Sequence, residues 1–104
     1  DVIIVAAAFT RTTGEAHWEV LLRARAIENQ AYVIASAQGG EHNSGRETWG
    51  HSMIIDPWGD IIAKCNFGKD IVLGEVDMKK LQTVRANLPA LEHQEFNLRK
   101  RLSC

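Results

Sequence analysis

The sequence predicts an α/β fold, in which a parallel strand–helix–strand unit is followed by an antiparallel hairpin. Two almost wholly apolar segments, residues 2–8 and 31–37, have the composition of strands that are covered on both faces. The segment between them is amphipathic and is expected to be helical from about residue 15 to residue 29. A helix between two strands of one sheet usually makes those strands parallel, so this order builds one side of a layered α/β domain.

The start and the apolar face of this helix follow from local patterns. Thr12 and Glu15 have the spacing of a capping box, in which a hydroxyl and a carboxylate satisfy backbone N–H groups at a helix start. Val20, Ala24 and Ile27 lie on one stripe, so we expect them to form the apolar face.

A hairpin is predicted in the second half of the chain. Ser52–Ile55 and Ile61–Cys65 flank the segment Asp56–Gly59, in which proline and glycine are a strong turn signal. The preceding segment, Gln38–Gly50, is polar and contains glycine, so we expect a loop there and regard it as a plausible functional segment.

The C-terminal third is expected to hold a strand at Ile71–Val76 and a short helix that Asp77 caps and Pro89 ends. The apolar face of that helix comprises Leu81, Val84 and Leu88. From these patterns we divide the chain into a domain at residues 1–92 and a polar, basic tail at residues 93–104.

Composition excludes several classes of protein. The chain has 104 residues, a net charge of −1 and 45% hydrophobic residues, which suits one small domain with a core. Nucleic-acid and anionic-membrane partners are not expected, because both require a basic face, and no apolar run approaches the ~18 residues of a membrane span. Two cysteines make no disulfide framework and fit a reducing compartment, so we expect a cytoplasmic location, with the mitochondrion as the alternative.

Metal, cofactor and nucleophile signatures are not found. The four histidines share no HExxH or CxxC spacing, and His17 is interpreted as a hydrogen-bonded packing residue. Cys65 belongs to a strand and Cys104 is the last residue, so neither thiol has the cation or helix start that activates a nucleophile. We therefore expect no metal site and no activated cysteine nucleophile within this chain.

The segment Phe9–Gly14 is a better candidate for ligand binding, because it leaves the carboxyl end of a predicted parallel strand. Phe9 could pack against a substrate, and the neighbouring threonines offer hydroxyl groups. The alternative is that Phe9 belongs to the core and the threonines only cap the helix. The sequence pattern alone favours this structural alternative.

Two polar segments remain open to more than one interpretation. Arg25, Glu28 and Asn29 could form a buried polar cluster at the helix end, and we interpret them as structural. The segment Gly45–His51 mixes charge, glycine and an aromatic residue, which suits a binding loop, a well-anchored turn or a subunit contact.

The first residues suggest that the chain is an excerpt of a longer protein. It opens with Asp1 rather than methionine, and an apolar strand follows at once. Such a strand needs neighbours on both sides, whereas natural termini are usually peripheral. A chain that simply begins with a strand is the alternative.

Two segments resemble a known family. AAFTRTTGEAHWEVLLRARAIENQ, residues 7–30, and TWGHSMIIDPWGD, residues 48–60, are similar to the C-terminal part of the nitrilase, or carbon-nitrogen hydrolase, superfamily. Within it, they look most like the branch of deaminated-glutathione amidases and ω-amidases. The resemblance covers residues 1–92.

The resemblance implies a four-layer α-β-β-α sandwich that is truncated at its N-terminal side here and forms a homodimer in the intact protein. It also implies cofactor-free hydrolysis of an amide C–N bond by a glutamate, a lysine and a cysteine. All three catalytic residues would lie outside this chain, so the chain alone is expected to be inactive.

Phe9 and Thr13 match positions that line the substrate pocket in this branch, so the resemblance makes them the substrate-binding candidates. The expected substrate is a small amide that bears a carboxylate. The rival hypothesis is a truncated, non-catalytic paralogue that acts as a binding or oligomerisation partner.

Overall fold

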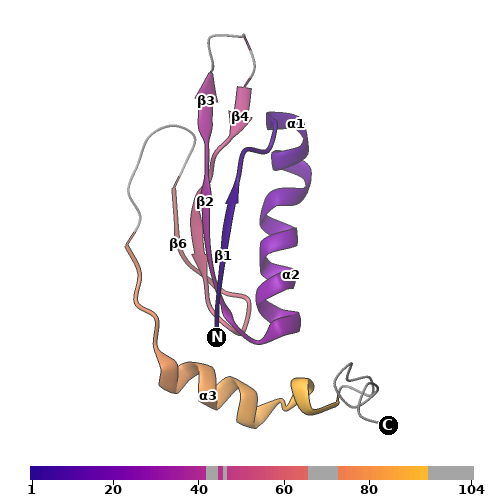
Figure 1. Ribbon diagram of the computed structural model, residues 1–104, viewed down its shortest axis with the longest axis vertical. Helices are drawn as coiled ribbons and strands as arrows, with labels where there is room; N and C mark the ends of the chain where they lie inside the picture. Colours follow the sequence, from indigo (N-terminus) through magenta and orange to yellow (C-terminus); the bar gives the residue numbers. More distant parts are fainter. Residues whose placement is uncertain (42–44, 46, 66–72, 94–104) are drawn as a thin grey trace, which may run out of the picture.

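The computed structural model describes residues 1–41, 45, 47–65 and 73–93. Its main sheet contains β1 (Val2–Ala7), β2 (Tyr32–Ala37), β5 (Met53–Ile55) and β6 (Ile61–Lys64), in the order β1-β2-β5-β6. Figure 1 shows the long helix α2 lying along the strands of this sheet and α3 lying across one end of it. The α/β fold is confirmed, whereas the four-layer sandwich stays a prediction.

The strand–helix–strand unit is built as expected. β1 and β2 are parallel, and their register runs without a break from the pair Val2 and Tyr32 to the pair Ala7 and Ala37. The apolar composition of β1 is typical of a strand covered on both faces, but within this chain alternate residues of β1 are exposed and Ile4 is 76% exposed. β1 is an edge strand of the sheet, and among the described residues only β2 pairs with it.

The helix starts earlier than predicted. It consists of α1 (Arg11–Thr13), a π-helical turn η1 (Gly14–Trp18) and α2 (Glu19–Asn29). The predicted capping box at Thr12 is wrong: the N-cap is Thr10, which is extended and accepts a hydrogen bond from the Thr13 N–H. Thr12 instead lies inside α1, where its backbone is already helical.

The buried face of the helix also differs from the predicted stripe. Trp18, Leu22 and Ala26 are buried, whereas Val20 is 68% and Ile27 50% exposed. The large indole of Trp18 decides how the helix is rotated about its axis. It occupies the core, and its Nε1 donates to the carbonyl of His51 at 2.8 Å. Residues at i, i+4 and i+8 from Trp18 then face the sheet.

The core lies between this helix and the sheet. Its buried members are Trp18, Leu22, Ala26, Val33, Ala35, Met53 and Ile55. The hairpin beyond them is confirmed: β5 and β6 are antiparallel, and the turn closes with the N–H of Gly59 donating to the carbonyl of Asp56 at 3.0 Å. Gly59 has φ of 99°, a left-handed conformation that glycine adopts without strain.

The predicted loop at residues 38–50 contains a small antiparallel ribbon instead. Its strands are β3 (Gly39–Glu41) and β4 (Glu47–Trp49). Three-residue strands with glycines carry too little apolar alternation for a sequence pattern to reveal them. In Figure 1 the ribbon extends beyond the main sheet, and β4 lies beside α1.

The C-terminal third is partly as predicted. Asp77 caps α3 (Met78–Asn87), and its Oδ1 accepts from the N–H groups of Lys79 and Lys80. A short 3₁₀ helix, η2 (Ala90–His93), follows Pro89. The predicted strand at Ile71–Val76 is wrong for its described residues, since 73–76 form no strand. The tail from residue 94 lies outside the described residues, and the domain boundary at residue 92 stays a prediction.

Candidate functional site

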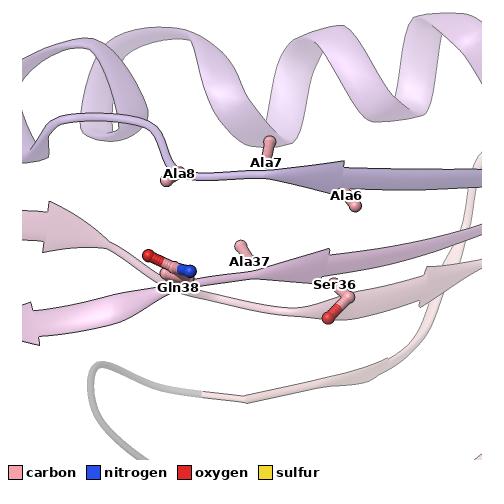
Figure 2. A pocket seen from close by; sticks show the side chains of 6 residues that line it. All are labelled: Ala6, Ala7, Ala8, Ser36, Ala37 and Gln38. Atoms are coloured by element: carbon pink, nitrogen blue, oxygen red, sulfur yellow. The ribbon is translucent and has the colours of Figure 1, made fainter.

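A shallow hollow lies where the two parallel strands end. It has a volume of about 410 Å³ and is lined by residues 6–8 at the end of β1 and residues 36–38 at the end of β2. Figure 2 shows the side chains of Ala6, Ala7 and Ala8 along one strand, with those of Ser36 and Gln38 on the other. The carboxyl ends of parallel strands are where α/β folds gather ligand sites.

The chemistry of this hollow is mostly apolar. Four of its six lining residues are alanines, which leave room for a ligand and offer methyl contacts. Ser36 and Gln38 supply a hydroxyl and an amide, and both residues are exposed. The hollow can therefore take a small apolar group beside hydrogen-bonding groups, but none of its six lining residues is an acid or a base that could activate the Ser36 hydroxyl.

Phe9 follows the hollow in the chain but does not line it. Its ring centroid lies 5.0 Å from that of Trp18, with the ring planes at 58°. This tilted arrangement is favourable for aromatic pairs. Phe9 is partly buried and packs against the core. This position agrees with the alternative interpretation from the sequence, in which Phe9 belongs to the core.

Thr13 also has a local structural role. Its N–H donates to the Oγ1 of Thr10 at 3.5 Å, and the two hydroxyl oxygens lie 2.8 Å apart. Thr13 is exposed, so its side chain remains accessible to a ligand. Phe9 precedes the N-cap of α1 and Thr13 ends α1, so both belong to the segment that follows the hollow in the chain, and their substrate-binding role stays a prediction.

The strand β4 anchors this loop, a contact that the sequence analysis missed. The Trp49 N–H donates to the carbonyl of Phe9 at 2.8 Å, and Thr10 and Thr48 form an antiparallel bridge. Beside them, Arg11 pairs with Glu47 at 3.0 Å. Of the three interpretations of residues 45–51, the well-anchored turn agrees with these contacts.

A second charged cluster holds α3 on the hairpin. The Asp56 carboxylate is buried and accepts from the N–H groups of Trp58 and Asp60 and, at 2.6 Å, from the Nζ of Lys80. Burial alone would raise the pKa of Asp56, but these hydrogen bonds outweigh it and lower that pKa below its ordinary value. The bond to Asp56 raises the pKa of Lys80.

This cluster is structural rather than catalytic in character. Asp56 is ionised and fully engaged at neutral pH, so it is a poor proton acceptor. Two of its three donors are backbone groups of its own turn.

The remaining candidates add no reactive group. Within residues 1–41, 45, 47–65 and 73–93, no three His, Cys, Asp or Glu side chains gather as metal ligands would. Cys65 is buried at 4% exposure, as expected for a packed thiol, and Cys104 lies outside the described residues. Over the same described ranges, no helix is both long and apolar enough to cross a membrane.

Two interpretations of polar residues need correction. His17 is exposed on the outer side of η1 rather than packed, because Trp18 turns towards the core in its place. Arg25 pairs with Glu28, and the Asn29 side chain donates to the Arg25 carbonyl at 2.9 Å. This cluster is structural as predicted, but it lies on the surface and is not buried.

Comparison with protein families gives one clear match. The family model described as carbon-nitrogen hydrolase matches residues 1–86.

Similar proteins of known name agree with this match. The deaminated glutathione amidase of Mus musculus is 48% identical over 98 residues, which is 94% of this chain and 30% of that protein. The chain thus spans about a third of the length of the deaminated glutathione amidases that it matches.

Solved structures show the same fold. The NitFhit protein of C. elegans superposes with a TM-score of 0.83 and 47% identity, over 90% of this chain and 23% of that one. Nit3 of Saccharomyces cerevisiae, a member of branch 10 of the nitrilase superfamily, superposes with a TM-score of 0.84 and 33% identity, over 91% of this chain and 35% of that one.

Proposed function

Because the chain belongs to the carbon-nitrogen hydrolase family, we propose that it is a segment of an amidase that hydrolyses an amide C–N bond of a small substrate bearing a carboxylate. The observation that carries this proposal is the 48% identity to a deaminated glutathione amidase over 94% of the chain. Deaminated glutathione and a small ω-amide such as α-ketoglutaramate are the substrates to test. We further propose a homodimeric, cytoplasmic parent protein with the α-β-β-α sandwich.

In the proposed reaction, a cysteine thiolate attacks the amide carbon and ammonia leaves as a thioester forms. A glutamate moves the protons, a lysine stabilises the oxyanion, and water then releases the acid. These three residues would be supplied by the part of the parent protein outside this chain. The hollow after β1 and β2 would form one wall of the substrate site.

Phe9 and Thr13 would recognise the substrate in this scheme. Phe9 is partly buried beside Trp18, so it offers a fixed apolar surface. Thr13 is exposed, and its hydroxyl would exchange its hydrogen bond to the Thr10 carbonyl for one to a carboxylate of the substrate. A hydrogen bond to a charged group contributes roughly 1.5–3 kcal/mol, which corresponds to about ten- to a hundredfold in kcat/KM.

An ammonia-release assay tests the division of roles between this segment and the rest of the protein. The 104-residue chain should stay at background with deaminated glutathione and α-ketoglutaramate, while the longer protein should turn at least one of them over. The Cys65→Ala variant of the chain is the control. If the chain alone is active and Cys65→Ala abolishes that activity, the assignment of an external nucleophile is wrong.

Variants of the longer protein test the two recognition residues. Thr13→Val and Phe9→Ala should lower kcat/KM, mostly through KM, and Thr13→Val should leave Tm nearly unchanged. Thr83→Val on α3 is the matched control, because Thr83 is also exposed and hydrogen-bonded to its own helix. Unaltered kinetics in Thr13→Val, or a loss explained wholly by unfolding, would leave the loop with a structural role only.

A peptide map of the native protein tests how this segment is embedded in it. The identities above predict a protein about three times as long as the chain. The map also shows whether the additional sequence lies before Asp1 or after Cys104. A native protein of 104 residues would instead support the non-catalytic paralogue.

A further inference from the structure

Trp49 occupies a space that only a glycine at position 14 leaves open. A Cβ on Gly14 would lie 2.2 Å from the Cβ of Trp49 and 2.4 Å from its Cγ. Gly14 has φ of −64° and ψ of −47°, a helical conformation in which alanine is ordinarily preferred. The glycine is therefore required by the approach of Trp49 and not by its own backbone.

The other side of Trp49 is held by His51. The two rings are stacked, with centroids 4.1 Å apart and planes at 18°, and the His51 Nδ1 lies 2.7 Å from the Trp49 carbonyl oxygen. Gly50 and His51 both have positive φ, 72° and 58°. Histidine adopts this conformation only at a cost, so the stack and the hydrogen bond must compensate for it.

Together, Gly14, Trp49 and His51 form what we call the Trp49 clamp. One side of the clamp meets the start of the π-helical turn at Gly14, and the Trp49 backbone holds the Phe9 carbonyl. The His51 carbonyl also accepts from Trp18, the residue on which Phe9 packs. The clamp thus contacts both ends of the segment that carries Phe9 and Thr13.

We propose that Trp49 is a positioning residue that fixes the Phe9–Gly14 loop for recognition of the substrate carboxylate; this inference rests on the proposed amidase function. Trp49 is not among the residues that line the hollow, and its contacts reach Gly14 and the Phe9 carbonyl, so the role assigned to it runs through this segment. A π-helical turn is uncommon and is frequent at functional sites, and here it begins at the residue against which Trp49 packs. Without the clamp, the Thr13 hydroxyl would keep its contacts with Thr10, but Trp49 would no longer hold the segment that carries both residues at Phe9 and Gly14.

Substrate selectivity distinguishes positioning from a general loss of folded enzyme. The longer protein is assayed with succinamate and with butyramide, which has a methyl group where succinamate has its carboxylate. Trp49→Ala should lower kcat/KM for succinamate about tenfold, mostly through KM, and that for butyramide by less than about twofold. Gly14→Ala should give the same change of selectivity, since its methyl group displaces the indole.

Two controls accompany these variants. Trp49→Phe keeps an aromatic ring against Gly14 and should retain most of the selectivity. Trp58→Ala removes an exposed tryptophan from the hairpin turn and should leave both rates unchanged. An equal loss on the two substrates in Trp49→Ala, or no loss, would overturn the proposal.

Hydrogen exchange of the longer protein separates this inference from the amidase proposal. In Trp49→Ala, the amides of residues 9–14 should exchange faster than in the wild type, whereas Trp58→Ala should leave them unchanged. If the wild type hydrolyses no amide, the proposed function fails, and exchange alone then decides whether Trp49 holds the loop. Unchanged exchange in Trp49→Ala overturns the positioning role whatever the enzyme activity.

Discussion

The two faces of the main sheet differ in how completely this chain covers them. On one face, Trp18, Leu22 and Ala26 of the helix bury the alternate side chains of β2 and β5. On the other face, Tyr32 and Ile54 are buried, whereas Val2 and Ile4 of β1 are exposed. The helix face is therefore a finished core, whereas on the opposite face the described residues cover Tyr32 and Ile54 and leave Val2 and Ile4 of β1 exposed.

The contacts on the second face show which strands are covered by other parts of the chain. The Tyr32 hydroxyl lies between the backbone N–H and carbonyl of Asp77, and a Cβ on Gly74 would lie 2.9 Å from the Cδ1 of Ile54. Asp77 and Gly74 both precede α3, so this segment contacts β2 and β5. Among the described residues, the cover of the second face is thus supplied by the segment before α3, whereas α3 itself lies across one end of the sheet.

The largest expected effect is on the finished face. Trp18→Ala should lower the free energy of unfolding by about 3–5 kcal/mol, because it leaves a cavity and removes the hydrogen bond to His51. Urea unfolding of the longer protein measures this effect. Trp58→Ala is the control, since Trp58 is 57% exposed, and it should change stability by no more than about 0.5 kcal/mol. Similar losses for both variants would contradict a core centred on Trp18.

A smaller effect is expected where α3 is attached. The pKa of Asp56 lies below its ordinary 3.8 in the folded state, so its contribution to stability is complete above pH 3.8. That contribution is lost as the pH falls through the lower pKa of the folded protein. Unfolding midpoints measured from pH 6 downwards should decrease in this acid range.

The Asp56→Asn variant is the control for that acid range. It should be less stable than the wild type at pH 6, and the difference should shrink as the pH falls. A constant difference between the two proteins would show that the ion pair with Lys80 does not contribute. The same pair predicts loss of stability at alkaline pH, as the pH rises through the raised pKa of Lys80.

The smallest effect on stability is expected on the open face. Ile4→Ala should change the free energy of unfolding by no more than about 0.5 kcal/mol in the 104-residue chain, because Ile4 is 76% exposed. Ile55→Ala on the finished face should cost about 2–5 kcal/mol by comparison.

Self-association of the chain also tests the difference between the covered helix face and the exposed face of the main sheet. Exposed apolar side chains beside an open strand edge favour aggregation, so size-exclusion chromatography should show self-association or a weakly cooperative species. Ile4→Lys should reduce that association. A monodisperse wild-type monomer with a sharp unfolding transition would show that the open face needs no partner.

The elements with a strong periodic or turn signal were predictable from the sequence. The apolar runs of β1 and β2 and the turn at Asp56–Gly59 each depend on residues close in the chain, and the structure confirms all three. The cap at Asp77 is local in the same sense. Sequence patterns succeed where the determining contacts lie within a few residues.

The missed features depend on contacts between distant residues. Trp18 sets the rotation of the helix through a hydrogen bond to His51, and Trp49 sets the need for glycine at position 14. Neither partner can be identified from spacing alone. The candidate site shows the same limit: the sequence predicted its loop, but the alanines that line the hollow carried no chemical signal.

The attachment of α3 has a consequence for the order in which the chain folds. Its contacts with the rest of the molecule join residues very far apart in sequence, such as Arg85 to Asp1 at a separation of 84 and Gln30 to Leu88 at 58. Contacts of this kind close the longest loops, so their entropic cost is met only after the local strand–helix–strand unit exists. We therefore expect α3 to dock last during folding and to detach first under mild denaturation.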